Sequence, residues 1–339
     1  MRAIPPVVKT TGISPTISMN TEKAVLNYFI QNLGNYTSGE ELSNKLNISR
    51  TAVWKAVKQL KEQGYEISSK TRKGYCLVDN GVLNTALINK YLHTDNLDLH
   101  VYETIGSTNS EAKNISSQRH STEPLVIISD QQTAGYGRYG RKFESPKNTG
   151  IYMSILLENQ HQNDLNPGLL TTAVAIAVSR TIKKLFHKDT EIKWVNDVLL
   201  DGKKICGILT EGVANLETQS ISQVIIGIGI NYTTPLEVFP AELRERVGSL
   251  KDLAEEYHVS RNMFIACCLD EFFAIYRNYT SADFMDEYRK LSVVIGKEVR
   301  IKQGNKIITG VVSTIDDLGR IVLTDGQIFS SGEVTKIRY

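Results

Sequence analysis

The sequence predicts an α+β protein of two or three domains, and three observations lead to that expectation. The chain of 339 residues is longer than one ordinary domain. Helical periods open the chain, and buried-looking strands mixed with helices fill its middle. Short strands at regular spacing, separated by Gly and Asp turns, fill residues 293–339.

Composition narrows the class of protein. With 41% hydrophobic and 22% charged residues the chain is globular, and its net charge of +2 means that any affinity for nucleic acid comes from a local patch. The cysteines show no CxxC spacing and no neighbouring histidine cluster, which predicts reduced thiols in a cytoplasmic protein and no zinc site or disulfide framework. No apolar run reaches about 18 residues, so we expect no membrane span.

Residues 1–19 differ from the rest of the chain. They contain Pro, Thr, Ser and Ile but no contiguous apolar segment, so we expect no signal peptide there. We expect a disordered tail there, and Met19 is an alternative start of the protein.

Residues 20–82 begin with helical patterns and end with strand-like ones. An apolar face repeats at helical spacing between residues 21 and 33. Ser38 and Glu41 fit a capping box, and Ser49 can cap the helix that follows a tight turn. The next segment, YEISSKTRKGYCLV, consists of two short strand-like runs around a basic tip. This order predicts a winged helix-turn-helix domain.

The predicted winged helix-turn-helix carries an excess of positive charge. Between residues 40 and 75 there are eight basic and four acidic side chains, 8 − 4 = +4, on a chain whose total is +2. The charge falls on the third helix and the wing, the elements that meet a DNA duplex, so we expect salt-dependent DNA binding in preference to a protein-interaction role. Trp54 either reaches the DNA or packs at the helix edge. The residues expected at the DNA are Ser49, Arg50, Thr51, Lys55, Lys58, Arg72 and Lys73.

Polar and glycine-rich turns interrupt the strands of the middle segment. Residues 107–109, with the sequence STN, lie at a strand-to-helix turn, where they either cap the helix or contact a ligand. The loop TAGYGRYGRKFESP, residues 133–146, follows the apolar strand LVIISDQQ. Its glycines let backbone N–H groups converge on an anion and its arginines add charge, so it is either a phosphate or carboxylate site or a flexible surface loop. It is neither a Walker A nor a Rossmann motif.

A lysine-containing hairpin follows in EIKWVNDVLLDGKKICGIL, with its turn at the DG pair. Lys204 begins a buried-looking strand, and a lysine held by an apolar sheet usually has an anionic partner. A surface hairpin with scattered lysines is the alternative. Polar side chains gather around the hairpin: Lys193, Asn196, Asp197 and Lys204.

Taken together, these motifs resemble a known family. With the winged helix in front, the chain resembles the bifunctional biotin protein ligase/biotin operon repressor family (the BirA family) over residues 20–339. The resemblance implies a catalytic domain at residues 83–292, with a class II synthetase-like mixed sheet and helices, and an SH3-like barrel at residues 293–339. The motifs occur in the family's order: STN (107–109), QQTAGYGRYGRKF (131–143), KWVNDVLLDGKKICGIL (193–209) and GIGINY (227–232).

The resemblance implies an ATP-dependent biotin–[acetyl-CoA-carboxylase] ligase. The biotin carboxylate attacks the α-phosphate of Mg-ATP and gives biotinoyl-5′-AMP and pyrophosphate. A lysine of the biotin carboxyl carrier protein of acetyl-CoA carboxylase then takes the biotinoyl group. Biotin, ATP and Mg²⁺ are thus the implied substrates and cofactors. The adenylate also serves as corepressor and favours a homodimer on operator DNA, in a cytoplasmic protein without membrane attachment.

By motif position, the resemblance implies a role for each site residue. Lys204 meets the biotin carboxylate or the α-phosphate, Arg138 closes over the adenylate, and Lys193 and Asp197 position the incoming lysine. The implied catalytic set is therefore Lys204, Arg138, Lys193 and Asp197. The implied biotin-binding set is Ser107, Thr108, Asn109, Gln132, Gly135, Tyr136, Arg138 and Lys204. The implied nucleotide-binding set is Gly137, Arg141, Asn196 and Asn231.

The chain departs from the family pattern at particular positions. Tyr136 stands where the family usually has an arginine that shields the intermediate, which predicts weaker retention of biotinoyl-AMP or stacking by Tyr136. Val195 replaces a proline, and Phe143 replaces a tryptophan. Two alternatives remain: a biotin-sensing repressor with weak or lost ligase activity, and a lipoate ligase of the same fold. Lys204, Arg138 and the STN turn favour a working ligase, while GRYGRK and the winged helix favour biotin.

Overall fold

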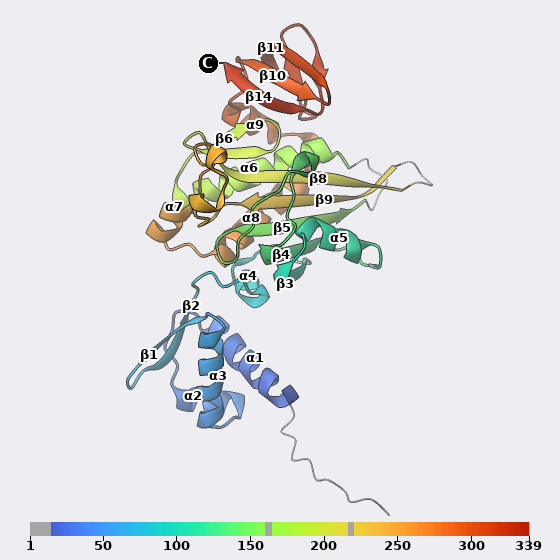
Figure 1. Cartoon of the computed structure of the whole chain (residues 1–339). Helices are drawn as coiled ribbons and strands as arrows, with labels where there is room; N and C mark the ends of the chain where they lie inside the picture. Colours follow the sequence, from blue (N-terminus) through green and yellow to red (C-terminus); the bar gives the residue numbers. More distant parts are fainter. Residues whose placement is uncertain (1–14, 160–164, 216–219, 339) are drawn as a thin grey trace, which may run out of the picture. The chain divides into compact units, whose positions relative to one another are not determined.

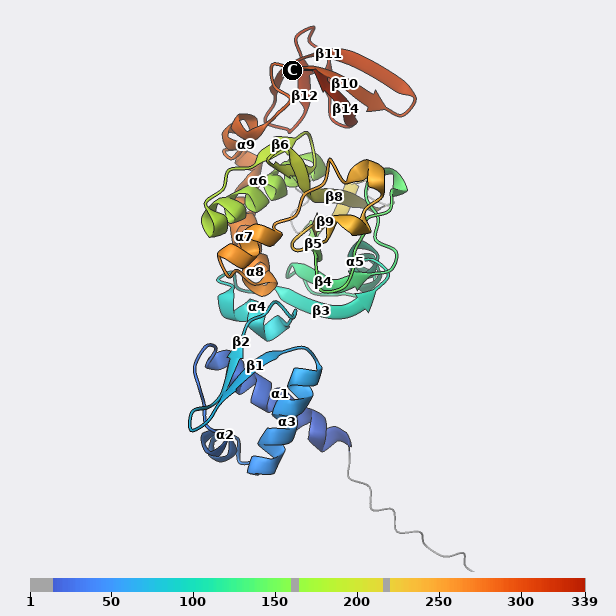
Figure 2. The same cartoon turned by 60° about the vertical axis from the view of Figure 1, so that its left-hand side comes forward.

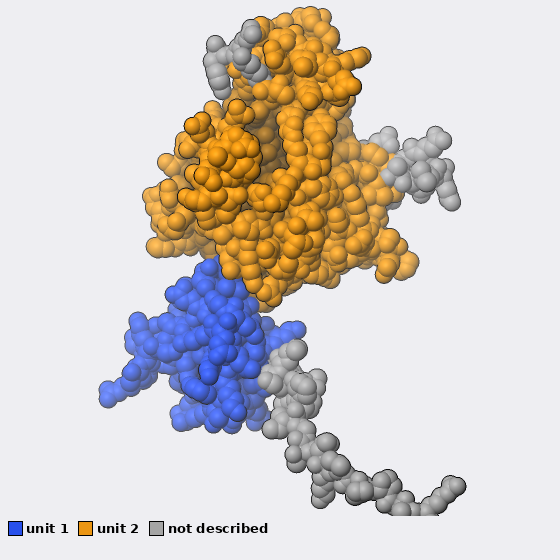
Figure 3. Space-filling view, in the orientation of Figure 1, with its two compact units in different colours: residues 1–82 blue, residues 83–339 orange. Residues whose placement is uncertain are grey.

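The structure, a computed structural model, describes residues 15–159, 165–215 and 220–338, and divides into two units, residues 1–82 and 83–339 (Figure 3). In the first unit β1 and β2 pair antiparallel and form the wing, so the winged helix-turn-helix predicted from the sequence is confirmed. Its elements are α1 (Pro15–Gln31), α2 (Gly39–Leu46), α3 (Arg50–Glu62), β1 (Glu66–Lys70) and β2 (Gly74–Val78) (Figure 1).

Hydroxyl groups set where α2 and α3 begin. Ser38 Oγ accepts a hydrogen bond from the backbone N–H of Glu41 at 3.0 Å, and Ser49 Oγ accepts one from that of Ala52 at 3.1 Å. The Glu41 carboxylate accepts from the Tyr28 hydroxyl at 3.0 Å, so its side chain serves α1 and the cap is made by Ser38. The apolar faces of the three helices bury Val25, Phe29, Leu42, Val53 and Leu60.

The first helix begins earlier than the sequence predicts. α1 starts at Pro15, so residues 15–19, which the sequence places in a disordered tail, belong to a helix. Proline suits the first turn of a helix because its fixed φ is helical and the N–H that it lacks would have no partner there. Residues 1–14 of the expected tail lie outside the described residues.

A mixed sheet forms the centre of the second unit (Figures 1 and 2), in agreement with the sequence prediction. Its described strands run in the order β3-β4-β5-β9-β8-β7-β6, with β3 and β4 parallel and the other neighbours antiparallel. The strands are β3 (Asp98–Ile105), β4 (Leu125–Gln132), β5 (Ile151–Glu158), β6 (Glu191–Lys193), β7 (Asp197–Leu200), β8 (Lys203–Asn215) and β9 (Ser220–Ile230).

Helices pack on both faces of this sheet. Val126 and Ile128 of β4 belong to the large core that includes α6 and α8, whereas the alternate residues Leu125 and Ile127 pack with Ala112 of α5. The face toward α5 is the one that carries the candidate site. The helices of this unit are α4 (Thr85–Tyr91), α5 (Thr108–Ser116), α6 (Pro167–Phe186), α7 (Lys251–Glu256), α8 (Arg261–Tyr276) and α9 (Met285–Leu291).

The last strands form a separate antiparallel sheet, in the order β13-β12-β11-β10-β14. Side chains fasten it to the rest of the second unit. The buried indole N–H of Trp194 donates to the carbonyl of Gly319 at 2.8 Å, and Arg289 donates to the carbonyl of Ile315 at 3.0 Å. These are the short C-terminal strands predicted from the sequence: β10 (Glu298–Gln303), β11 (Lys306–Ile315), β12 (Ile321–Leu323), β13 (Ile328–Phe329) and β14 (Glu333–Arg338).

The cysteines are free thiols in the interior. Burial in apolar surroundings raises the pKa of Cys206 and of Cys268, so both thiols are protonated at neutral pH. Cys76 and Cys267 are also free and buried. Among the described residues, no helix has the length and the apolar character needed to cross a bilayer.

Candidate functional site

Three glycines leave part of the α5 face of the central sheet without side chains where β8 and β9 pair. Gly207 and Gly229 are register partners on these strands, and Gly227 lies on the same face of β9. A Cβ at Gly229 would overlap the ring of Phe143, and a Cβ at Gly227 would overlap the carboxamide of Asn109. The missing side chains therefore provide the space into which neighbouring segments reach, and we call these three glycines the glycine floor.

The STN turn, residues 107–109, projects buried polar groups toward this floor. Thr108 donates from its backbone N–H and its hydroxyl to Gln132 Oε1, at 2.9 and 3.2 Å. Asn109 Oδ1 lies 2.6 Å from the hydroxyl of Ser154. Ser107 occupies the N-cap position of α5, but within the described residues its side chain accepts no capping hydrogen bond. Capping alone therefore does not explain the turn, and the structure brings it together with Gln132.

The 133–146 loop is narrow at its base. Tyr136 and Lys142 form an isolated antiparallel bridge, which joins the two limbs of the loop. Gly135 approaches the strand so closely that a Cβ there would lie 2.9 Å from Gln132 Nε2. The base of the loop thus packs against the residue that contacts the STN turn, and only glycine fits at position 135 without displacement.

Arginines hold the loop against the C-terminal sheet. Arg138 donates from Nη1 to Asn196 Oδ1 at 3.1 Å and from Nη2 to the carbonyl of Gly332 at 2.8 Å. Arg141 makes a bidentate pair with Glu333, at 2.7 and 2.8 Å. That pairing raises the pKa of Arg141 and lowers the pKa of Glu333, so both remain charged. The hydrogen bonds of Arg138 thus go to neutral acceptors, whereas those of Arg141 go to a carboxylate.

Lys204 and Asp197 form an ion pair beside the glycine floor. Lys204 Nζ lies 2.7 Å from Asp197 Oδ1, and both side chains are partly buried. The anionic partner predicted for Lys204 from its place in a buried strand is therefore confirmed. The contact is close but poorly angled: Asp197 Oδ1 is buried and, within the described part of the chain, has no partner of hydrogen-bond geometry. This oxygen can accept a further donor.

The remaining predicted residues differ in how they are held. Lys193 is the register partner of Asp197 and so lies beside it at the end of β6. Asn196 donates from Nδ2 to a backbone carbonyl of β8 at 3.1 Å, which fixes its carboxamide. Asn231 is buried and donates to the carbonyl of Gly248 at 3.1 Å, so it also fastens the segment that follows β9.

Glu211 of β8 and Lys113 of α5 were not expected at the site. The sequence does contain a signal for Glu211, because it lies four residues after Gly207 and strand alternation places both on one face. A carboxylate on the inner face of a buried strand requires partners. The Glu211 carboxylate accepts hydrogen bonds from Asn109 Nδ2 at 2.6 Å, Lys113 Nζ at 2.8 Å and Tyr136 OH at 3.0 Å.

The residues expected at DNA lie on the surface of the first unit. Trp54 has 55% of its surface exposed and Lys58 Nζ lies 5.9 Å from its ring centroid, so Trp54 does not pack in the core. Arg50 pairs with Glu40 at 2.7 Å. All of the residues expected at the DNA are exposed: Ser49, Arg50, Thr51, Lys55, Lys58, Arg72 and Lys73.

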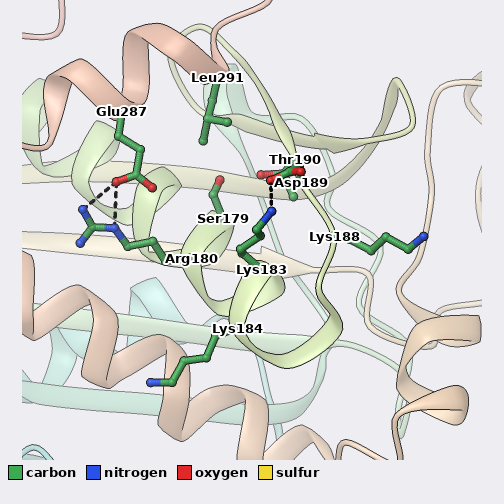
Figure 4. A pocket seen from close by; sticks show the side chains of 9 residues that line it. All are labelled: Ser179, Arg180, Lys183, Lys184, Lys188, Asp189, Thr190, Glu287 and Leu291. Atoms are coloured by element: carbon green, nitrogen blue, oxygen red, sulfur yellow. Dashed lines mark hydrogen bonds and ion pairs between the residues drawn. The ribbon is translucent and has the colours of Figure 1, made fainter.

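A hollow near the C-terminal end of α6 contains none of the residues predicted to bind biotin or nucleotide or to act in catalysis (Figure 4). Four of its charged side chains pair with one another: Arg180 Nε donates to Glu287 at 2.9 Å and Lys183 Nζ to Asp189 at 2.6 Å. We therefore assign the candidate site to the glycine floor. The hollow is lined by Ser179, Arg180, Lys183, Lys184, Lys188, Asp189, Thr190, Glu287 and Leu291.

Comparison with known proteins agrees with this arrangement. Family models match in sequence order: an HTH domain at 21–76, the biotin/lipoate A/B protein ligase family at 101–231 and the biotin protein ligase C terminal domain at 294–336. The bifunctional ligase/repressor BirA of Bacillus subtilis is 34% identical over 90% of this chain and 94% of its own length. That of Escherichia coli is 28% identical over 89% of this chain and 93% of its own. The solved biotin protein ligase of Aquifex aeolicus, in complex with biotin and ATP, has 24% identity and a TM-score of 0.57, covering 71% of this chain and 98% of its own, and so shares the fold.

Proposed function

Because this chain belongs to the family of the bifunctional ligase/repressor BirA, we propose that it joins biotin to a carrier protein at the expense of ATP and represses transcription of biotin genes. In the first step the biotin carboxylate attacks the α-phosphorus of Mg-ATP, and pyrophosphate leaves. In the second, a carrier lysine amine attacks the acyl carbon, loses a proton and forms an amide, and AMP leaves.

The position of the Lys204 ammonium is the observation that supports the ligase proposal. Its ammonium is held by Asp197 at 2.7 Å, next to a floor without side chains. The first step brings a carboxylate and a triphosphate together, so it requires cations and hydrogen-bond donors and no protein nucleophile. Lys204 neutralises the biotin carboxylate or the α-phosphate, and Arg138 covers the adenylate from the loop. Mg²⁺ arrives with the phosphates of ATP, the usual mode for that ion.

Biotin lies on the glycine floor in this proposal. Thr108, Asn109 and Gln132 offer hydroxyl and amide groups that can exchange their present partners for the ureido ring. Phe143, which lies against Gly229, supplies an apolar wall. The biotin-binding set is completed by Ser107, Gly135 and Tyr136, with Arg138 and Lys204 at the acyl end.

The nucleotide and the carrier lysine approach from the loop and the β6–β7 turn. Asn196 accepts from Arg138 at 3.1 Å, so one hydrogen bond already joins the loop to this turn. Lys193 and Asp197 direct the incoming lysine, whose ammonium can donate to the buried Oδ1 of Asp197. The proposed nucleotide-binding set is Gly137, Arg141, Asn196 and Asn231.

The repressor function is proposed for the first unit. The exposed basic residues of α3 and the wing contact operator DNA, with α3 in the major groove. Biotinoyl-AMP acts as corepressor by favouring a homodimer that occupies two half-sites. We propose the biotin carboxyl carrier protein of acetyl-CoA carboxylase as the carrier. The free buried cysteines suit a protein that works in the reducing cytoplasm.

A transfer assay tests the ligase half. Incubation with biotin, Mg-ATP and the carrier domain should add one biotin per carrier, and omission of ATP should prevent the addition. A protein that binds biotin but transfers none is a sensor that has lost its ligase activity. Transfer of lipoate and not of biotin would overturn the substrate assignment.

A gel shift on the promoter of the organism's biotin genes tests the repressor half. Biotin and ATP together should tighten the binding, and biotin or ATP alone should do so less. Binding that does not respond to these ligands, or no binding, contradicts the proposed switch.

A further inference from the structure

The Glu211 carboxylate lies between two segments that the proposed function uses separately. Asn109 and Lys113 are four residues apart on α5, so they project from one face of that helix and both donate to Glu211, at 2.6 and 2.8 Å. Tyr136, at the base of the 133–146 loop, donates to the same carboxylate at 3.0 Å. A side chain of β8 thus connects the biotin side of the site to the loop.

The connection reaches residues that are proposed to touch both ends of the adenylate. Asn109 belongs to the STN turn, over Gly227 of the floor. Tyr136 is bridged to Lys142 across the base of the loop, and Arg138 follows only two residues later. A displacement of the Tyr136 ring therefore shifts the start of the segment that carries Arg138.

The charges of this cluster are fixed at neutral pH. Burial alone would raise the pKa of Glu211, but the hydrogen bonds from Lys113, Asn109 and Tyr136 outweigh burial and lower it. Burial would lower the pKa of Lys113, but Glu211 outweighs that effect and raises it. Lys113 and Glu211 thus form an ion pair whose charges cancel. The cluster therefore supplies hydrogen bonds of fixed direction and adds no net charge to the site.

We propose that Glu211, supported by Lys113, is a positioning residue that holds the base of the loop through Tyr136 in one geometry relative to Asn109. The inference rests on the proposed function, because it assumes that the STN turn and the loop hold the same ligand. Its consequence is retention: losing the contact lets the loop leave the adenylate sooner, while Lys204 and Arg138 remain available for the chemistry.

The test compares full-length wild type with Tyr136→Phe, Glu211→Gln and the double variant. Tyr136→Phe removes one hydroxyl and keeps the ring. Each single change should speed dissociation of preformed biotinoyl-AMP roughly two- to tenfold, the range expected for one hydrogen bond. In Glu211→Gln, the change outside the proposed binding sets, the maximal rate of transfer at saturating biotin and ATP should stay within about twofold of wild type. The double variant should be less impaired than the product of the two single effects.

Tyr257→Phe is the matched control, because it removes a hydroxyl from an exposed tyrosine outside the loop and away from Arg138. It should leave adenylate dissociation unchanged. Lys113→Arg should retain the rate of wild type, whereas Lys113→Met should resemble Glu211→Gln. If Glu211 had a purely structural role, the dissociation rate of biotinoyl-AMP in each variant would rise in proportion to the loss in its melting temperature. Tyr136→Phe is the smallest change, so it keeps the test valid if Glu211→Gln folds poorly.

The results distinguish failure of the positioning role from failure of the ligase activity on which it rests. Unchanged dissociation in Tyr136→Phe, or single effects that multiply in the double variant, overturns the positioning role while wild-type transfer leaves the ligase proposal intact. Absence of transfer by the wild type overturns the ligase proposal and this inference with it. Faster dissociation, a preserved maximal rate and non-multiplicative effects together support the inference.

Discussion

Lys204 Nζ and Asp197 Oδ1 meet at 2.7 Å although the two residues are not opposite each other on β7 and β8. In the strand register Asp197 faces Gly207, and Lys204 faces Leu199. The lysine side chain therefore runs along its own strand, where a Cβ at position 207 would lie 3.1 Å from its Nζ. Gly207 thus gives the ammonium the room to reach the carboxylate.

Lys204→Met should lose adenylate formation by about 100-fold or more, the usual effect of removing one electrostatic contact to the reacting groups. Biotin-dependent exchange between ATP and pyrophosphate measures this step alone. The adjacent Lys203→Met is the matched control, since Lys203 is exposed and should keep normal exchange. Full exchange activity in Lys204→Met would show that the charge is assigned to the wrong residue.

Gly229→Ala should impair biotin binding. The added methyl overlaps the Phe143 ring, so either the ring or the strand must move, at a cost of about 1–3 kcal/mol in folding stability. If the ring moves into the proposed biotin space, the KM for biotin rises roughly tenfold or more. Gly39→Ala, in the first unit, meets only a side-chain atom at 3.7 Å and serves as the control for steady-state kinetics. An unchanged KM in a folded Gly229→Ala protein argues against biotin on the glycine floor.

Arg141→Gln and Glu333→Gln should weaken the hold of the C-terminal sheet on the loop. The Arg141 side chain is 63% exposed, so folding stability should change by only about 0–1 kcal/mol. Biotinoyl-AMP should nevertheless dissociate about two- to tenfold faster. Stopped-flow measurement of that rate in both single variants and the double variant gives the coupling energy between Arg141 and Glu333. Lys142→Gln, which alters the neighbouring pair with Glu144, is the control and should leave the rate unchanged.

The Glu211–Lys113 pair should stabilise the protein over a defined pH range. Glu211 has a pKa below the ordinary 4.5, so its contribution is present above that value and is lost as the pH falls through the lowered pKa. Lys113 has a pKa above the ordinary 10.5, so its contribution is lost only as the pH rises through the raised value. Urea unfolding of wild type and Glu211→Gln should therefore differ near neutral pH and converge as the pH falls through the lowered pKa of Glu211. A difference that persists unchanged in acid contradicts this assignment.

Arg72→Ala and Lys73→Ala should each weaken binding to operator and non-operator DNA alike. Each variant should reduce the slope of log K against log salt by about 1, since each removes one phosphate contact. Fluorescence anisotropy at several salt concentrations measures the slope. Lys90→Ala removes an exposed lysine from α4, outside the first unit, and should leave the slope unchanged. Equal slopes in all three variants would exclude the wing from the DNA interface.

Features that depend on neighbouring residues could be predicted from the sequence. The caps at Ser38 and Ser49, the wing and the hairpin before Lys204 each arise within a few residues, so turn chemistry and periodicity identify them. The anionic partner of Lys204 was also predictable, because a lysine at the start of a buried-looking strand usually has one and Asp197 is only seven residues away.

Contacts across the fold could not be predicted in the same way. Glu211 lies 98 residues from Lys113 and 75 from Tyr136, and Arg138 lies 194 residues from Gly332. No periodicity in the sequence relates positions so far apart, because sheet order and loop packing bring them together. The start of α1 was missed for another reason: the composition of residues 15–19 suggests disorder, while Pro15 suits a helical first turn.

The glycine floor has a practical consequence for redesign. If biotin lies on the glycine floor as proposed, a bulkier analogue cannot be admitted by shortening a side chain there, because positions 207, 227 and 229 already carry none. Additional room has to come from above the sheet, by shortening Phe143 or lengthening the loop that follows Gly135. Saturation mutagenesis should accordingly recover altered selectivity from the surrounding turns, while the floor itself tolerates almost no replacement.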